Sequence, residues 1–226
     1  MSPRKYRAIC LIYSDKMNST VLTKKYILPS FDTREILRYA GVSGSSPDFS
    51  ELMQSCLDET DGKLLYRVCY REFGIKTDAN IIDLGFAKTE SDDLAKNLQG
   101  CESIVLFAAT VGIELDRLIA KYSRISPSKA LFFQAIGAER IECLCDTFNR
   151  EIGELVSAAG KVTKPRFSPG YGDLPLSLQK DIFRALDCPR KIGLTLNGSL
   201  LMSPSKSVTA IIGIGDKNTY CGKELT

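Results

Sequence analysis

The segment from Arg166 to Asp173, with the sequence Arg-Phe-Ser-Pro-Gly-Tyr-Gly-Asp, combines a fixed cation, a turn and an aromatic ring. Arg166 can hold a carboxylate through two parallel hydrogen bonds. Pro169 and Gly170 favour a turn, and Gly170 lacks the side chain that would keep a ligand from the main chain. Tyr171 adds a ring that can stack or face a cation. The segment therefore predicts a pocket for a small zwitterion, although its residues also suit a plain turn before a helix.

A second group of residues is predicted to share one flank of the longest helix. Glu139, Glu142 and Asp146 are spaced three and four apart, so their carboxylates lie on the same side. A solvated helix face is the ordinary interpretation of such a flank. In the sharper interpretation, Glu142 meets the amino group of a bound amino acid while Arg166 holds its carboxylate.

The chain contains no histidine, which excludes several kinds of chemistry. It has no Ser-His or Cys-His nucleophile pair, no imidazole base and no histidine ligand for a metal ion. The eight cysteines contain no Cys-x-x-Cys pair, and Cys143 and Cys145 point in different directions on a helix, so we expect buried thiols and no metal site.

Composition suits one sizeable globular domain or two small lobes. The 226 residues are 44% hydrophobic and 25% charged, and the net charge is only +3. No window concentrates Lys and Arg with aromatic residues, so nucleic acid is not an expected partner. The apolar run Ala8 to Tyr13 is too short for a signal peptide and no segment is long enough to span a bilayer, which predicts a cytoplasmic protein.

Hydrophobic periodicity and capping residues predict the elements that position these side chains. The expected helices are Thr33 to Ala40, Phe49 to about Asp58, Ser91 to about Gly100, Ile113 to Tyr122, Ser126-Pro127 to Gly160, and Leu174 to Leu186. The expected strands are Lys63 to Phe73, Ala79 to Phe86, Ser103 to Ala109, Lys191 to Leu196, and Val208 to Ile214. We predict an α+β fold, with a lobe of residues 1–90 and a region of residues 91–226, or one continuous domain.

Several ordered segments carry a resemblance to a known family. They are Ala135 to Glu142, Arg166-x-x-x-Gly170-Tyr171, Ile192 to Ser199, Met202-Ser203-Pro204, Ser207 to Ala210, and Tyr220. Together they resemble the S-adenosylmethionine-binding activation domain of cobalamin-dependent methionine synthase. Two N-terminal segments, Arg34 to Tyr39 and Leu106 to Gly112, look more like stand-alone relatives of that domain.

The resemblance implies a mostly antiparallel twisted sheet with packed helices and a site for S-adenosylmethionine. The ligand-binding residues it implies are Glu142, Arg166, Ser168 (through its backbone), Gly170, Tyr171 and Tyr220. It further implies a separate reactivation subunit, in which the methyl group passes to cobalamin held by a partner methionine synthase or related corrinoid protein. Flavodoxin or ferredoxin would supply the electron indirectly.

The chain also departs from the family pattern. We identify no match to an acidic ligand contact that the fused form has in its N-terminal segment, and Phe167 replaces the first proline of the family motif. These departures keep open a second function, a non-catalytic docking or chaperone module with a drifted ligand site. A redox activator with an iron-sulfur centre near Cys221 is a third, for which the sequence supplies no cluster motif.

Overall fold

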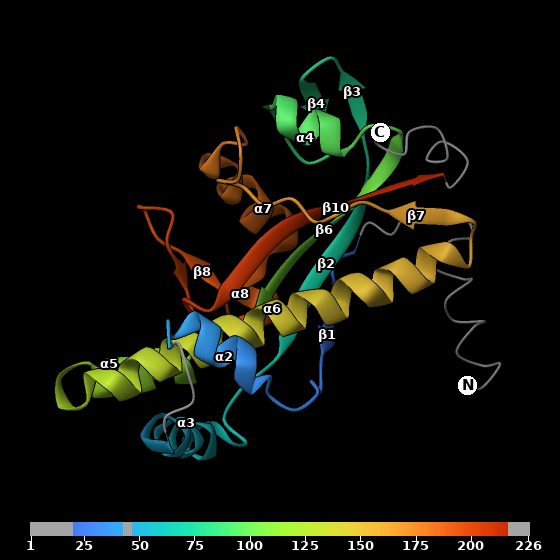
Figure 1. Cartoon of the computed structure of the whole chain (residues 1–226). Coiled ribbons are helices and arrows are strands. Elements are labelled where there is room, and N and C mark those ends of the chain that lie inside the picture. Colours follow the sequence, from blue (N-terminus) through green and yellow to red (C-terminus); the bar gives the residue numbers. More distant parts are fainter. Residues whose placement is uncertain (1–19, 43–46, 217–226) are drawn as a thin grey trace.

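The chain forms one main sheet with helices on both of its faces (Figure 1). The computed structural model describes residues 20–42 and 47–216. The helices are α2 (Thr33–Tyr39), α3 (Pro47–Thr60), α4 (Asp92–Asn97), α5 (Glu114–Ile125), α6 (Pro127–Ser157), the 3₁₀ helix η1 (Leu176–Leu178), α7 (Gln179–Leu186) and α8 (Cys188–Ile192). The strands are β1 (Leu22–Lys25), β2 (Arg67–Gly74), β3 (Lys76–Asp78), β4 (Ile81–Asp83), β5 (Lys88–Glu90), β6 (Cys101–Thr110), β7 (Lys161–Thr163), β8 (Thr195–Leu196), β9 (Met202–Ser203) and β10 (Ser207–Asp216).

The main sheet has five strands in the order β1-β2-β6-β10-β7, and every neighbouring pair is antiparallel. Its centre is the long pair of β6 and β10, which runs in register from Thr110 opposite Ser207 to Ser103 opposite Ile214 and shifts by a bulge before Gly215, which lies opposite Cys101. Smaller sheets, β3-β4-β5 and β8-β9, are attached to it. The predicted division at residue 90 runs through the main sheet, because β1 and β2 precede that position and the other three strands follow it.

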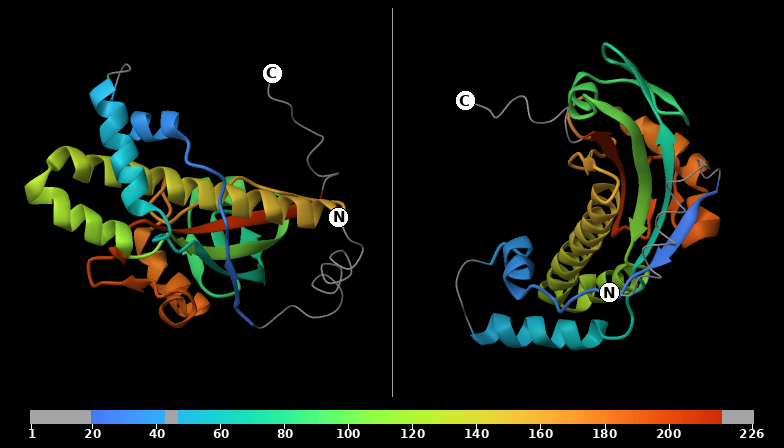
Figure 2. Two further views of the ribbon diagram at one scale, coloured as in Figure 1. Left: turned by 90° about the horizontal axis from the view of Figure 1, so that it is seen from below. Right: turned by 90° about the vertical axis from the view of Figure 1, so that its right-hand side faces the viewer.

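Both faces of the sheet are covered, which explains the continuous apolar run predicted as a buried strand. Phe107 of β6 and Ile212 of β10 belong to the core shared with α6, whereas Leu106 and Ile211 belong to the core shared with α7 and α8. Figure 2 shows α6 on one side of the curved sheet and α7 and α8 on the other. Successive side chains on a strand point to opposite faces, so each core takes alternate residues.

The predicted apolar stripe of the long helix faces the sheet as expected. Ile141, Leu144, Phe148 and Ile152 are buried. The Phe148 ring lies 4.8 Å from that of Phe107 on β6 and 5.2 Å from that of Tyr70 on β2. Pro127 stands in the first turn of α6, where its missing N–H costs no hydrogen bond. The stripe fixes the rotation of α6 about its axis and leaves its opposite flank available for a site.

The predicted strand from Lys191 to Leu196 is wrong over most of its length. Cys188–Ile192 forms α8, and only Thr195–Leu196 is extended. Pro189 lies in the first turn of this helix, and Gly193 ends it with a φ of +72°. Pro189 and Gly193 are typical of the start and end of a short helix, whereas the alternation of apolar residues in the same stretch predicted a strand.

Other boundaries differ because turns interrupt the apolar patterns. The strand predicted from Ala79 to Phe86 shrinks to β4, since Ala79 and Gly85 both have positive φ. The strand predicted from Lys63 begins only at Arg67, and the helix predicted from Leu174 divides into η1 and α7. The edge strands β1 and β7 are too short to give a periodic signal in the sequence, so they were not predicted.

Candidate functional site

The three carboxylates predicted on one flank of α6 lie there at very different depths. The side chain of Glu139 is 5% exposed, that of Glu142 is 42% exposed and that of Asp146 is 69% exposed. A plain solvated face therefore describes Asp146 but not Glu139. The flank instead runs from the protein interior to the surface.

Arg166 reaches this flank and pairs with two of the carboxylates. Its Nη2 donates a hydrogen bond to Glu142 Oε2, and its Nη1 lies 2.5 Å from Asp146 Oδ1. Burial acts to lower the pKa of Arg166, but the hydrogen bond to Asp146 and the nearby negative groups raise it overall. The structure thus brings Arg166 and Glu142 together as a direct ion pair. Their separate contacts with the two ends of a ligand stay a prediction.

An open cleft of about 510 Å³ lies beside this ion pair, between the start of α2 and the polar flank of α6. Its lining residues come from both halves of the chain and are Pro29, Ser30, Asp32, Glu35, Tyr39, Glu139, Glu142, Cys143, Asp146, Thr147 and Arg150. Five of them carry carboxylates and one is an arginine. A ligand with positive groups is therefore favoured there by Coulomb attraction.

Asp32 and Glu35 supply acidic groups to the cleft from the N-terminal half, where the sequence showed no match to the family's acidic ligand contact. Asp32 caps α2, and its Oδ1 accepts hydrogen bonds from the backbone N–H of Arg34 at 3.0 Å and of Glu35 at 3.2 Å. Glu35 also pairs with Arg38 one turn later. The capping pattern predicted the helix itself, but only the fold shows that its first turn meets α6.

A buried ion pair holds the α2 side of the cleft in place. Glu139 and Arg140 bond to each other at 5% and 2% side-chain exposure. Arg140 also donates to the backbone carbonyl of Pro29 at 2.8 Å and to that of Ser30 at 3.3 Å, and its guanidinium lies 4.3 Å from the ring of Phe31. The segment before α2 is thereby tied to the centre of α6.

The cysteine thiols in the cleft and beside it are poor nucleophiles at neutral pH. Cys143 lines the cleft, and burial raises its pKa. Burial also raises the pKa of Cys145 to about 12, against the opposing effect of Arg166. Both sulfurs stay protonated at neutral pH, so the arrangement is suited to binding and orienting a ligand rather than to attacking one.

The remaining predicted residues of the motif form a turn outside the cleft lining. Gly170 has a φ of +87° and donates its N–H to the carbonyl of Leu174 at 2.9 Å, while the Ser168 carbonyl accepts from Tyr171 at 3.1 Å. Tyr171 is 70% exposed, and its ring meets that of Phe167 edge-on at 5.5 Å. The plain-turn interpretation describes this part, whereas Arg166 bonds to two residues that line the cleft, Glu142 and Asp146.

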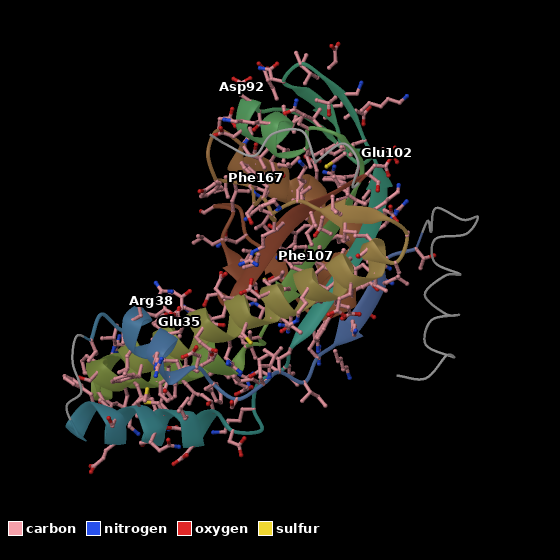
Figure 3. The ribbon with its side chains drawn as sticks, turned by 45° about the vertical axis from the view of Figure 1, so that its right-hand side comes forward. Glu35, Arg38, Asp92, Glu102, Phe107 and Phe167 are labelled. Carbon is pink, nitrogen blue, oxygen red and sulfur yellow. The ribbon has the colours of Figure 1, made fainter. Side chains whose placement is uncertain are left out.

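Backbone pairing fixes the start of the motif to the sheet. The N–H and C=O groups of Phe167 both bond to Ile211 of β10 at 2.8 Å. Figure 3 shows Phe167 well apart from Glu35 and Arg38 on α2. Arg166 therefore stands between the turn at one end and the cleft at the other. Tyr220, the last predicted ligand contact, lies outside the described residues.

Asp173, for which no separate role was predicted, attaches the end of the motif to α4. Its carboxylate accepts hydrogen bonds from the Ser91 hydroxyl and from the backbone N–H of Asp92 at 2.7 Å and of Asp93 at 3.3 Å. The Ser91 hydrogen bond is the main cause that holds the pKa of Asp173 below its ordinary value. An anion at a helix start is favourable, so this contact positions the turn.

Asp173→Asn is expected to lower thermal stability at neutral pH. Because the folded-state pKa of Asp173 is depressed, its contribution is present above the ordinary Asp pKa of about 3.9 and is lost as the pH falls through the lower folded value. The difference in unfolding midpoint between wild type and variant should therefore shrink below about pH 4, as measured by circular dichroism. Asp78→Asn on the exposed β3 is the control. A difference that is the same at pH 3 and pH 7 would contradict this role.

The described part of the chain shows neither a metal-binding cluster nor a membrane-spanning helix. Residues 20–42 and 47–216 contain no group of three or more His, Cys, Asp or Glu side chains that could hold a metal ion. Within the same ranges, none of the helices has the length and apolar character required to cross a membrane.

Comparison with known proteins identifies the fold. No family model and no curated protein matches the chain. Among solved structures, the MetH reactivation domain bound to AdoHcy is similar, with a TM-score of 0.59 and 15% sequence identity, over 92% of this chain and 80% of that one. The predicted α+β class with a mostly antiparallel sheet is confirmed. The chain shares the fold of the MetH reactivation domain.

Proposed function

We propose that this protein binds S-adenosylmethionine and serves as a separate reactivation subunit for cobalamin-dependent methionine synthase. The observation that carries the proposal is the acidic cleft beside Arg166, in a chain with the fold of a reactivation domain that binds AdoHcy. S-Adenosylmethionine has two positive groups, an ammonium and a sulfonium, and one carboxylate. A cleft lined by five carboxylates and bordered by an ion-paired arginine suits this charge distribution.

In this proposal, Arg166 binds the ligand carboxylate and Glu142 binds its ammonium group. Arg166 has five N–H donors in a planar fork, so it can stay bonded to one side-chain carboxylate while it donates hydrogen bonds to the carboxylate of the ligand. Asp146 is the more exposed of its two partners and is the one to be displaced. Asp32 and Glu35 add negative charge on the opposite wall, close to the place for the ligand's positive groups.

Tyr171 and its turn lie outside the cleft lining and would contact the part of the ligand that extends beyond Arg166. The ring is exposed, rests on Phe167 and can present its face to a cation. Ser168 and Gly170 would contribute backbone groups. Tyr220 would contribute an aromatic contact from the segment that follows β10.

The protein's part in catalysis is to orient the methyl donor. S-Adenosylmethionine would supply a methyl group to reduced cobalamin held by the partner protein, with its methyl C–S bond breaking and S-adenosylhomocysteine leaving. Transfer from a sulfonium requires no acid or base, in agreement with a chain that contains no histidine. The electron that reduces the cobalt would come from flavodoxin or ferredoxin.

A reactivation assay tests this proposal. The protein is mixed with inactive cobalt(II) methionine synthase, a reductant and S-adenosylmethionine, and formation of methylcobalamin is followed by its absorption spectrum. We expect recovery that depends on both this protein and S-adenosylmethionine. Absence of recovery with a matched partner enzyme would contradict the proposal.

One observation favours a second candidate, a docking or chaperone module for a corrinoid protein that does not use S-adenosylmethionine. The guanidinium of Arg166 is already neutralised by Glu142 and Asp146. If a ligand carboxylate displaces neither Glu142 nor Asp146 from Arg166, the ion pair has only a structural role, which is to join the motif to α6. Binding of the corrinoid protein without binding of S-adenosylmethionine would identify this function.

A further inference from the structure

A second hollow, of about 410 Å³, lies at the β1 edge of the main sheet and has the opposite charge to the cleft. Its lining residues are Thr23, Lys24, Lys25, Arg67, Lys191 and Ile192, from β1, β2 and α8. Four of these six residues are cationic and none is acidic. A site with this composition attracts anions.

Three of the cations have no acidic partner among the described residues. Lys24 pairs with Glu151 of α6, whereas Lys25, Arg67 and Lys191 take part in no ion pair of the described chain. Other surface arginines do have such a partner, as Arg117 has Glu114 and Arg184 has Asp181. The positive charge of the hollow is therefore left uncompensated by the described protein.

The register of the sheet concentrates this charge. Lys25 of β1 stands directly opposite Arg67 of β2. Like charges in directly opposed positions on neighbouring strands are destabilising. The alternation of side chains places both on the same face of the sheet, and Lys191 at the end of α8 completes the hollow. Such an arrangement becomes favourable when an anion lies between the cations.

Arg67 also has an unused hydrogen-bond donor. Its Nε is buried and has no partner among the described residues, although a buried donor without a partner costs free energy. Arginine presents its donors in a fork that matches the oxygens of a phosphate group. The Thr23 hydroxyl and two lysine ammonium groups supply further donors around the same space.

We propose that this hollow, formed by Lys25, Arg67, Lys191 and Thr23, binds a diphosphate group, either free or as part of a nucleoside diphosphate. Three uncompensated cations suit an anion with several charges, and phosphate oxygens match the arginine fork. The hollow includes residues of α8 and the cleft includes residues of α6, and the two sites share no lining residue. The inference does not depend on the binding of S-adenosylmethionine.

Calorimetric titration tests the inference with sodium pyrophosphate and with ADP, at constant ionic strength and without divalent cations. The variants are Lys25→Gln and Lys191→Gln, both at exposed positions, where we expect the substitution to leave folding intact. The control is Lys76→Gln, an equal loss of charge on the exposed β3. We expect one saturable site on the wild type and the control, with affinity at least tenfold lower in each of the two variants.

The two ligands distinguish the sources of the diphosphate. Tighter binding of ADP than of pyrophosphate would identify a nucleoside diphosphate, and equal or weaker binding would identify the free anion. Either result supports the site. Absence of saturable binding by both ligands, or equal affinities in wild type, Lys25→Gln and Lys191→Gln, would overturn it.

Discussion

Replacement of Arg140 by leucine is expected to lower the free energy of unfolding by about 3–5 kcal/mol. The change leaves the carboxylate of Glu139 buried at 5% exposure without its partner. It also removes the hydrogen bonds to the carbonyls of Pro29 and Ser30 and the contact with Phe31. The cost is large because a buried charge must then be neutralised or exposed to water.

Urea unfolding followed by circular dichroism measures this effect. Arg117→Leu is the matched control, since Arg117 pairs with Glu114 on the surface of α5 at 69% exposure, and an exposed pair contributes at most about 1 kcal/mol. The double variant Glu139→Leu with Arg140→Leu should recover part of the loss, because no unpaired charge remains. An Arg140→Leu effect as small as that of Arg117→Leu would show that Arg140 does not hold the segment before α2.

Arg166→Ala is expected to weaken binding of S-adenosylmethionine by about 2 kcal/mol, or roughly thirtyfold. The variant removes the charged donor for the ligand carboxylate. It also leaves Glu142 and Asp146 without the cation between them. The carboxylate of the ligand then has no arginine to bind and is repelled by these two side chains.

The measurement is a calorimetric titration, with folding of the variant checked by thermal unfolding. Arg184→Ala is the control, because Arg184 is an exposed arginine on α7 that also pairs with an acidic side chain. We expect the control to bind as the wild type does. If Arg166→Ala binds as tightly as Arg184→Ala, the ion pair has only a structural role and the docking function is favoured.

Much of the fold could be predicted from sequence because its main elements have strong periodic signals. The stripe through Leu144 and Phe148 placed α6, and the apolar run from Ser103 to Ala109 placed the central strand β6. The prediction failed where conformation depends on single residues or on distant partners. Pro189 and Gly193 form α8 within an apolar stretch, and β1 exists because β2 offers it an edge.

The candidate site could be predicted only in part, for a similar reason. The helix spacing grouped Glu142 with its neighbours, and the motif identified Arg166, but neither pattern showed that they pair directly. Asp32 was missed as an acid of the cleft because its proximity to α6 arises from tertiary packing, at a separation of 107 residues from Glu139. The different depths of Glu139 and Asp146 likewise follow from what covers α6.

Calorimetric titration of S-adenosylmethionine into the wild-type protein tests the central claim most directly, with S-adenosylhomocysteine as the second ligand. We expect one saturable site per chain. S-Adenosylmethionine should bind about tenfold more tightly than S-adenosylhomocysteine, because only the former places a sulfonium charge in a cleft lined by five carboxylates. Absence of saturable binding up to millimolar S-adenosylmethionine would contradict the claim.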